Sequence, residues 1–263
     1  MEASCEAQAP SPDGAFLIPS LPMKSILLPN KFNSIVWAQA LFFAVLVAFG
    51  VVDALTVLLA YFLETIIIGI LHVIKLAMVN RYGKTSKPTS KPQPQGIGLI
   101  LFFIIHYGFF VAIQSIFMFG FFEGAIPEIT SGFNLIENYS YAFRHPGMVP
   151  VLASIVITNF TYFITNFIQP QRHKEYSSSE LFMKPYVRIF VQQFAVILGG
   201  FFFVILQAGT ATAVLLILFR LCVDLVMVAL RKDSKALQTV AQKLTKEPAD
   251  FEKMKKELER FSE

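Results

Sequence analysis

The stretch that decides the fold is residues 34–79, which read SIVWAQALFFAVLVAFGVVDALTVLLAYFLETIIIGILHVIKLAMV. A helix of about 20 apolar residues crosses the roughly 30 Å hydrocarbon core of a bilayer, so this block is too long for one crossing. Gly50 and Asp53 offer a break, because an Asp carboxylate caps a following helix by accepting its backbone N–H bonds. The sequence therefore predicts two transmembrane spans, at 34–51 and 53–79.

The rest of the chain repeats this pattern. Hydrophobic residues make up 55% of the sequence and charged residues 15%, whereas a soluble domain carries about 25% charged residues. Further apolar segments lie at 97–122, 148–168, 185–206 and 210–230. In lipid such segments must be helical, and the alternating pattern of a β-barrel is absent. The predicted fold class is all-α, a polytopic membrane helix bundle with six transmembrane helices.

Lys and Arg residues outside the spans lie almost entirely on one side of this topology. Eighteen fall in the regions 1–33, 80–96, 169–184 and 231–263, and one, Arg144, falls on the other side. By the positive-inside rule, both termini are expected in the cytoplasm, as in a bacterial inner or plasma membrane. The basic residues are thus explained by the lipid bilayer, and no nucleic-acid partner is expected.

Three regions follow from this reading. Residues 1–33 form a Pro-containing N-terminal tail, 34–231 the six-helix transmembrane domain, and 232–263 a cytoplasmic helical tail. Apolar residues recur at helical spacing in that last tail, namely Phe251, Met254, Leu258 and Phe261. The pattern predicts an amphipathic helix that lies on the membrane or against the bundle, or that contacts another subunit of a homo-oligomer or membrane complex. The apolar residues of the 123–147 loop predict that it packs onto the bundle.

Polar and ionisable residues inside the spans are costly in lipid and are therefore functional candidates. They are Glu64, His72 and Lys75 on the second span, His106 and Gln114 on the third, Arg188 and Gln193 on the fifth, and Arg220 and Asp224 on the sixth. At 1.5 Å per residue, their depths converge between the midplane and the cytoplasmic half of the bilayer. The sequence predicts a polar cluster between these four spans. A milder polar stripe, Asn159, Tyr162 and Asn166, follows the fourth span.

Roles within this cluster follow from charge and spacing. Glu64 is expected to be the central carboxylate with Arg188 as its counter-charge, and Lys75 and Arg220 are further charge partners. Arg220 and Asp224 are four residues apart on one helix, which favours a direct pair. His106 is expected to be a hydrogen-bond donor or a ligand.

Several functions remain open at this point. The cluster can be a set of structural ion pairs, or a small-ligand or ion pathway in which Glu64 or Asp224 titrates. His72 and His106, at matching depth, can ligate a haem or a transition metal. No HExxH, GxSxG, Walker or CxxC motif is present, which favours a non-enzymatic membrane protein or an accessory subunit of a membrane complex.

Certain motifs resemble an uncharacterised family of prokaryotic polytopic integral membrane proteins. They are Tyr61-Phe62-Leu63-Glu64 with Gly69 and Lys75, FFIIHYG at 102–108, PYVRI at 185–189, Gly199-Gly200 and Asp224. The resemblance covers about residues 34–231 and implies a membrane bundle without an assigned activity. It also implies His at the positions of Gln114, Gln193 and Val228. Glutamine is a poorer transition-metal ligand than imidazole, so a metal site of the family would be incomplete here.

Overall fold

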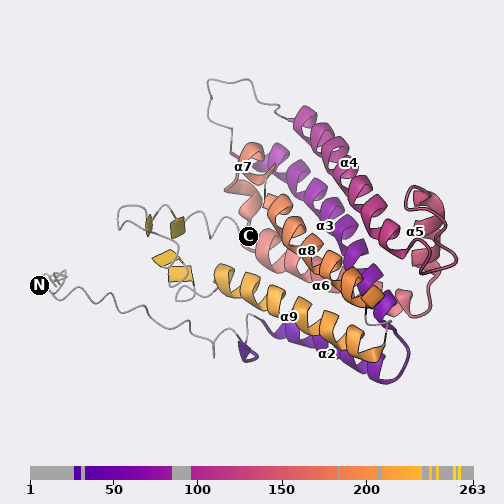
Figure 1. The fold of residues 1–263 in the computed structure, drawn as a ribbon. Helices are drawn as coiled ribbons and strands as arrows, with labels where there is room; N and C mark the ends of the chain where they lie inside the picture. Colours follow the sequence, from indigo (N-terminus) through magenta and orange to yellow (C-terminus); the bar gives the residue numbers. More distant parts are fainter. Residues whose placement is uncertain are drawn as a thin grey trace, which may run out of the picture.

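The computed structural model describes residues 27–30, 33–84, 96–182, 184–205 and 209–232, with short pieces at 237–238, 241–242, 251–252 and 254–255. Within the helices, it does not describe the side chains of residues 187, 188, 191, 192, 195, 196, 204 and 230–232. Across the described residues the regular secondary structure is helical and includes no strand, so the predicted all-α class is confirmed (Figure 1).

The predicted break in the first apolar block is confirmed. Helix α2 spans Ser34–Ala48 and helix α3 spans Ala54–Tyr82. Gly50 between them has φ of 67°, a left-handed conformation that glycine adopts without strain. Asp53 is the N-cap of α3, and its Oδ1 accepts a 2.7 Å hydrogen bond from the Thr56 backbone N–H. The cap satisfies a donor that the helix leaves unpaired at its first turn.

The other long helices begin and end within two residues of the predicted spans. They are α4 (Ile97–Phe122), α6 (Met148–Phe163) with its π-helical continuation η1 (Ile164–Ile168), α8 (Lys184–Ile205) and α9 (Thr210–Lys232). Three short elements join them: α5 (Leu135–Arg144), the 3-10 turn η2 (Arg172–Lys174) and α7 (Ser178–Phe182).

Four helical segments of the described chain are long and apolar enough to cross a membrane. They are 54–82, 97–122, 148–168 and 210–229. Helix α2 is apolar but has only 15 residues, and α8 has 22 residues with several side chains undescribed. Membrane crossing by α2 and α8 therefore stays a prediction.

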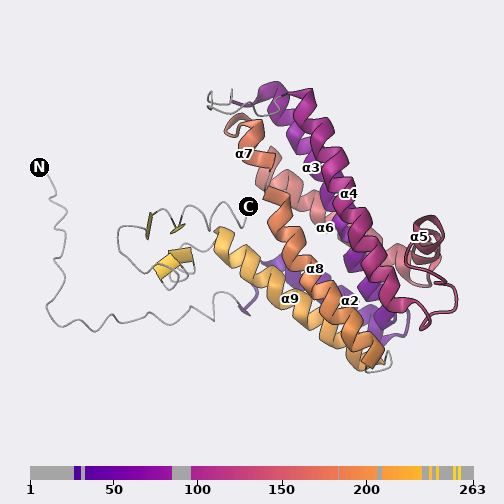
Figure 2. The same cartoon turned by 45° about the horizontal axis from the view of Figure 1, so that its top comes forward.

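Helix α3 is the centre of the bundle. It packs against α4, α6, α8 and α9, while α2 lies on the far side along α9 and α6 (Figures 1 and 2). In its most apolar window 67% of α3 is buried, compared with 28% for α4. The polar residues Glu64, Thr65 and His72 of α3 are consequently buried inside the protein.

Helix α4 shows the opposite pattern along its outer side. It exposes a row of large apolar side chains, including Phe102, Ile105, Phe109, Phe117 and Phe121. In water a contiguous apolar surface of this kind is unfavourable, whereas lipid tails solvate it well. The exposed row fits a helix that faces lipid.

The loop 123–147 packs onto the bundle as the sequence predicted, and it contains a helix, α5, that the sequence analysis did not predict. Ile126 and Ile129 are buried, and the Tyr139 hydroxyl lies 2.6 Å from the Ser115 hydroxyl of α4. Burial raises the pKa of Tyr139, partly opposed by the hydrogen bond with Ser115. The hydroxyl therefore keeps its proton and the contact between α5 and α4 persists at ordinary pH.

Some predictions lie outside the described residues. The N-terminal tail before residue 27, the loop 85–95 and most of the predicted amphipathic helix in 232–263 belong to that part of the chain.

Candidate functional site

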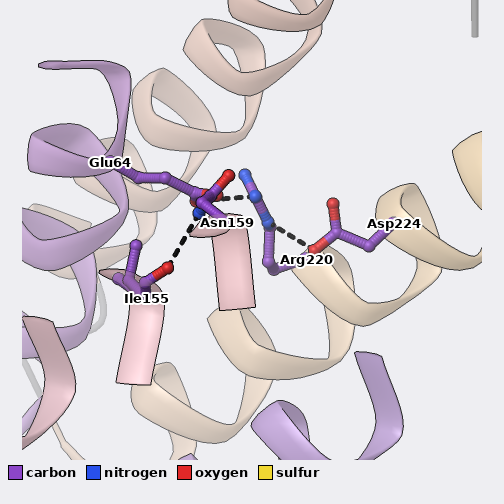
Figure 3. Close-up of polar contacts among 5 residues, drawn as sticks. All are labelled: Glu64, Ile155, Asn159, Arg220 and Asp224. Atoms are coloured by element: carbon purple, nitrogen blue, oxygen red, sulfur yellow. Dashed lines mark hydrogen bonds and ion pairs between the residues drawn. The ribbon is translucent and has the colours of Figure 1, made fainter. Parts of the chain in front are cut away.

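A buried ion pair joins the central helix to α9. The Glu64 side chain is 2% exposed and the Arg220 side chain 7% exposed, and Arg220 Nη2 donates to Glu64 Oε2 at 2.6 Å. Charges buried this deeply are very costly unless they are paired and hydrogen-bonded. The pair therefore fixes α9 against α3 at mid-helix (Figure 3).

Arg220 also binds a second carboxylate on its own helix. Its Nε donates to Asp224 Oδ2 at 2.8 Å, which is the pairing that the four-residue spacing predicted. The guanidinium lies 5.3 Å from the centre of the Tyr61 ring of α3. One cation is thus shared by two carboxylates and faces an aromatic ring.

A third helix contributes an amide. Asn159 of α6 donates from Nδ2 to Glu64 Oε1 at 2.9 Å, and the same nitrogen lies 3.0 Å from its own helix's Ile155 carbonyl. These contacts connect α3, α6 and α9, as the close-up of the site shows (Figure 3). Asn159 belongs to the polar stripe predicted along the fourth span, and it was not among the residues predicted for the cluster. The polar spacing of that stripe was the signal that could have identified it.

A small pocket borders this network between α2, α3, α6 and α9. Its polar lining comes from Glu64, Asp224, Thr158, Tyr162 and Gln39, and its apolar lining from Val36, Met227 and Val228. Asp224 is the most accessible member of the network, with 23% of its side chain exposed. Of the lining residues, only Glu64 and Asp224 were predicted as site residues.

The other candidates on α3 lie away from this pocket. His72 is buried with its ring 4.9 Å from that of Phe103, and it is hydrogen-bonded to the backbone of Leu181. Its Nε2 has no partner among the described residues. Lys75 lies over the ring of Phe167 in η1, at 5.4 Å from the ring centre.

The second histidine, His106, occupies a different environment. It is exposed on α4, stacks on Phe102 and has its Nδ1 2.7 Å from the Tyr186 hydroxyl. His72 is buried beside the fully buried ring of Phe103, whereas His106 is exposed. The two imidazoles therefore lie in different surroundings. In the described part of the chain, no group of three or more His, Cys, Asp or Glu side chains is placed to hold a metal.

The remaining predicted residues, Gln114, Arg188 and Gln193, belong to α4 and α8. Gln114 is 5% exposed, and neither atom of its amide has a partner in the region that the structure describes. Gln193 lines a second small pocket with Met118, Phe122 and Gly200. The side chain of Arg188 lies outside the described residues, so its predicted role as counter-charge to Glu64 stays a prediction.

These features define a class of protein, an all-α bundle with helices of membrane-spanning length. The family of unknown function DUF6498 matches residues 23–241, and the chain belongs to that family. The match includes the whole region in which the sequence resembled an uncharacterised family. No curated protein and no solved structure matches the chain. Function must therefore be argued from the site itself.

Proposed function

We propose that this protein is a six-span integral membrane protein with both termini in the cytoplasm, and that it binds a small solute without catalysing a reaction. The solute carries a positive charge or several hydrogen-bond donors. The eighteen-to-one distribution of Lys and Arg supports the orientation. Helix α8, at 22 residues, is about 33 Å long, which is enough for a crossing.

One observation carries the binding proposal: two carboxylates share a single guanidinium and both line the same pocket. Asp224 accepts its hydrogen bond from Arg220 through Oδ2, and no partner of Oδ1 lies among the described residues. A carboxylate oxygen at low dielectric attracts a cation or a donor strongly, because water does not screen it. The nearby Thr158 and Tyr162 hydroxyls and the Gln39 amide offer further oxygen acceptors.

Binding of a solute also explains why the Asp224 carboxylate is partly exposed while the Glu64 carboxylate is buried. Glu64 is closed in by Arg220 and Asn159, so it sets the charge of the pocket wall. Asp224 is partly exposed on the pocket side and is the group that a solute would contact first. A cluster that served only to hold helices together would have no need of an open side.

The proposal is tested by cysteine accessibility in a background with Cys5 and Cys222 changed to Ser. Thr158→Cys is placed in the pocket wall, and Phe109→Cys is its control on the exposed apolar side of α4. A small cationic thiol reagent is expected to modify Thr158→Cys faster than an anionic reagent of the same size. The lipid-facing control is expected to stay unmodified, because a thiol without water forms little thiolate.

The charge preference must depend on the pocket carboxylates. Adding Asp224→Asn to Thr158→Cys is expected to bring the two reagents to similar rates. If Thr158→Cys is as unreactive as the α4 control, the pocket is closed to solutes and the network is purely structural. If it reacts without charge preference, the pocket is open but not selective for cations, and the proposed solute class is wrong.

A further inference from the structure

The segment that leads into α5 runs back along α4 rather than beyond its end. At Gly132, an added Cβ would lie 2.6 Å from the Ile116 carbonyl oxygen and 2.9 Å from the Gly120 nitrogen. The backbone of this segment therefore touches the backbone of α4, which only glycine permits here. Farther along, Tyr139 reaches Ser115 of α4.

These contacts fix how deep α5 lies. Ser115 precedes the last residue of α4, Phe122, by seven residues, which corresponds to about 10 Å along the helix axis. Helix α5 thus lies beside the last two turns of α4, as the turned view shows (Figure 2). That is the depth at which a bilayer changes from hydrocarbon to headgroups when α4 crosses it.

At this depth α5 presents an apolar stripe that no described residue of the chain covers. Ile136 is 89% exposed and Phe143 52% exposed, and their seven-residue spacing places them on one helix face. Phe133, just before the helix, is 76% exposed. Glu137 and Arg144 directly follow Ile136 and Phe143 and are also seven residues apart. A charged stripe therefore runs beside the apolar one. Parallel apolar and charged stripes are typical of helices that lie in a membrane interface.

Helix α4 also exposes apolar side chains at this depth. Phe117 and Phe121 directly follow the two α4 residues that contact Gly132, so they lie on the adjacent face of the helix. Both are exposed, Phe117 at 65%. Exposed apolar side chains are thus present at this depth on both α4 and α5, and those on α4 have the character of a lipid-facing side.

We propose that α5 is an interfacial helix whose Phe133, Ile136 and Phe143 insert into the outer leaflet, with Glu137 and Arg144 among the lipid headgroups. The occupant of this surface is lipid, because the stripe lies beside the turns of α4 that expose Phe117 and Phe121. This inference rests on the proposed membrane topology. It gives the 123–147 loop a second role besides covering the bundle, which is to anchor the outer ends of α4 and α6.

Fluorescence quenching of single-tryptophan variants tests this inference. In a Trp37→Phe background, Trp replaces Ile136 or Phe143 on α5, Phe109 on α4, or Glu128 at the exposed loop. The full chain is reconstituted in phosphatidylcholine vesicles that contain lipids brominated either near the headgroup or near the chain ends. Ile136→Trp and Phe143→Trp are expected to lose fluorescence mainly with the shallow bromine. Phe109→Trp should lose more with the deep one, and Glu128→Trp should be quenched only by aqueous iodide.

Each other outcome identifies a different failure. Quenching of both α5 positions by iodide and not by bromolipid would show a water-exposed helix and overturn the inference. Protection of these positions from both quenchers would show that a protein surface covers α5, such as a second copy, and would also overturn it. If Phe109→Trp also escapes bromolipid, α4 does not face lipid, and the proposed topology fails rather than the placement of α5 alone.

Discussion

The Tyr107 ring of α4 lies against Gly69 of α3, and its hydroxyl reaches the α3 backbone. Its hydroxyl donates a 2.6 Å hydrogen bond to the Thr65 carbonyl, one turn before Gly69. A Cβ at Gly69 would overlap the Tyr107 ring. The close approach of α3 and α4 thus depends on the absence of one side chain, as is common where membrane helices pack.

Gly69→Ala should destabilise the protein, because the tyrosine ring must move and loses its hydrogen bond. We expect a loss of about 1–3 kcal/mol, in the range for overpacking a dense core. Gly108→Ala is the matched control, since nothing lies within 4 Å of its added Cβ. Thermal unfolding in mild detergent measures both. Equal melting temperatures for the two variants would contradict the tight contact at Gly69.

Asp53→Ala should remove the N-cap of α3. The Asp53 carboxylate accepts from the Thr56 backbone and from its hydroxyl, at 2.7 and 2.6 Å. Loss of an N-cap costs about 0.5–2 kcal/mol. Asp53→Asn keeps a capping oxygen and is expected to retain most of the stability. The same unfolding assay separates the two, and equal losses would mean that the carboxylate charge, not the cap, is what matters.

Glu64→Gln should strongly destabilise the bundle, because it leaves the Arg220 guanidinium buried with one carboxylate instead of two. Breaking a buried pair costs about 3–5 kcal/mol. Asp224→Asn is the milder comparison, since that side chain is 23% exposed. In a double-mutant cycle, Arg220→Gln in the Glu64→Gln background should cost less than Arg220→Gln alone. Additive losses would show that the two groups are not energetically coupled.

Labelling with a membrane-impermeant maleimide tests the proposed orientation. In the cysteine-free background, Glu128→Cys lies in the outer loop and Lys174→Cys on the expected cytoplasmic side. Intact cells should label only the first variant, and permeabilised cells should label both. The reverse pattern would invert the topology. Labelling of both residues in intact cells would place them on the same side of the membrane, and the predicted single crossing between them, at 148–168, would then be wrong.

The long helices were predictable because local sequence features determine where they begin and end. Gly50 and Asp53 end one helix and cap the next, and the apolar lengths match the bilayer. Helix α5 was missed because its 10 residues carry a mixed, amphipathic pattern inside a loop, with no stretch long enough to stand out. A short helix of that kind is stabilised by tertiary contacts such as Tyr139 with Ser115, which local sequence does not encode.

One contact within the site was predictable from the sequence, whereas the contacts between helices were not. Spacing correctly indicated that Arg220 and Asp224 pair, because both lie on one helix. That Asn159 of α6 contacts Glu64 depends on which helices adjoin α3, and hydropathy carries no such information. For the same reason, residues at matching depth need not meet: His72 faces the interior and His106 the surface.

The π-helical turn at Ile164–Ile168 makes the residue count of this segment matter. A π-helical turn holds more residues than an α-helical turn, so the residues after it are rotated relative to a regular continuation of α6. Deleting one residue there would restore a regular helix and rotate everything after it by about 100°. Phe167 would then leave the ammonium of Lys75. The number of residues in this segment therefore matters separately from its hydrophobicity, and a one-residue deletion there should be less well tolerated than an apolar substitution.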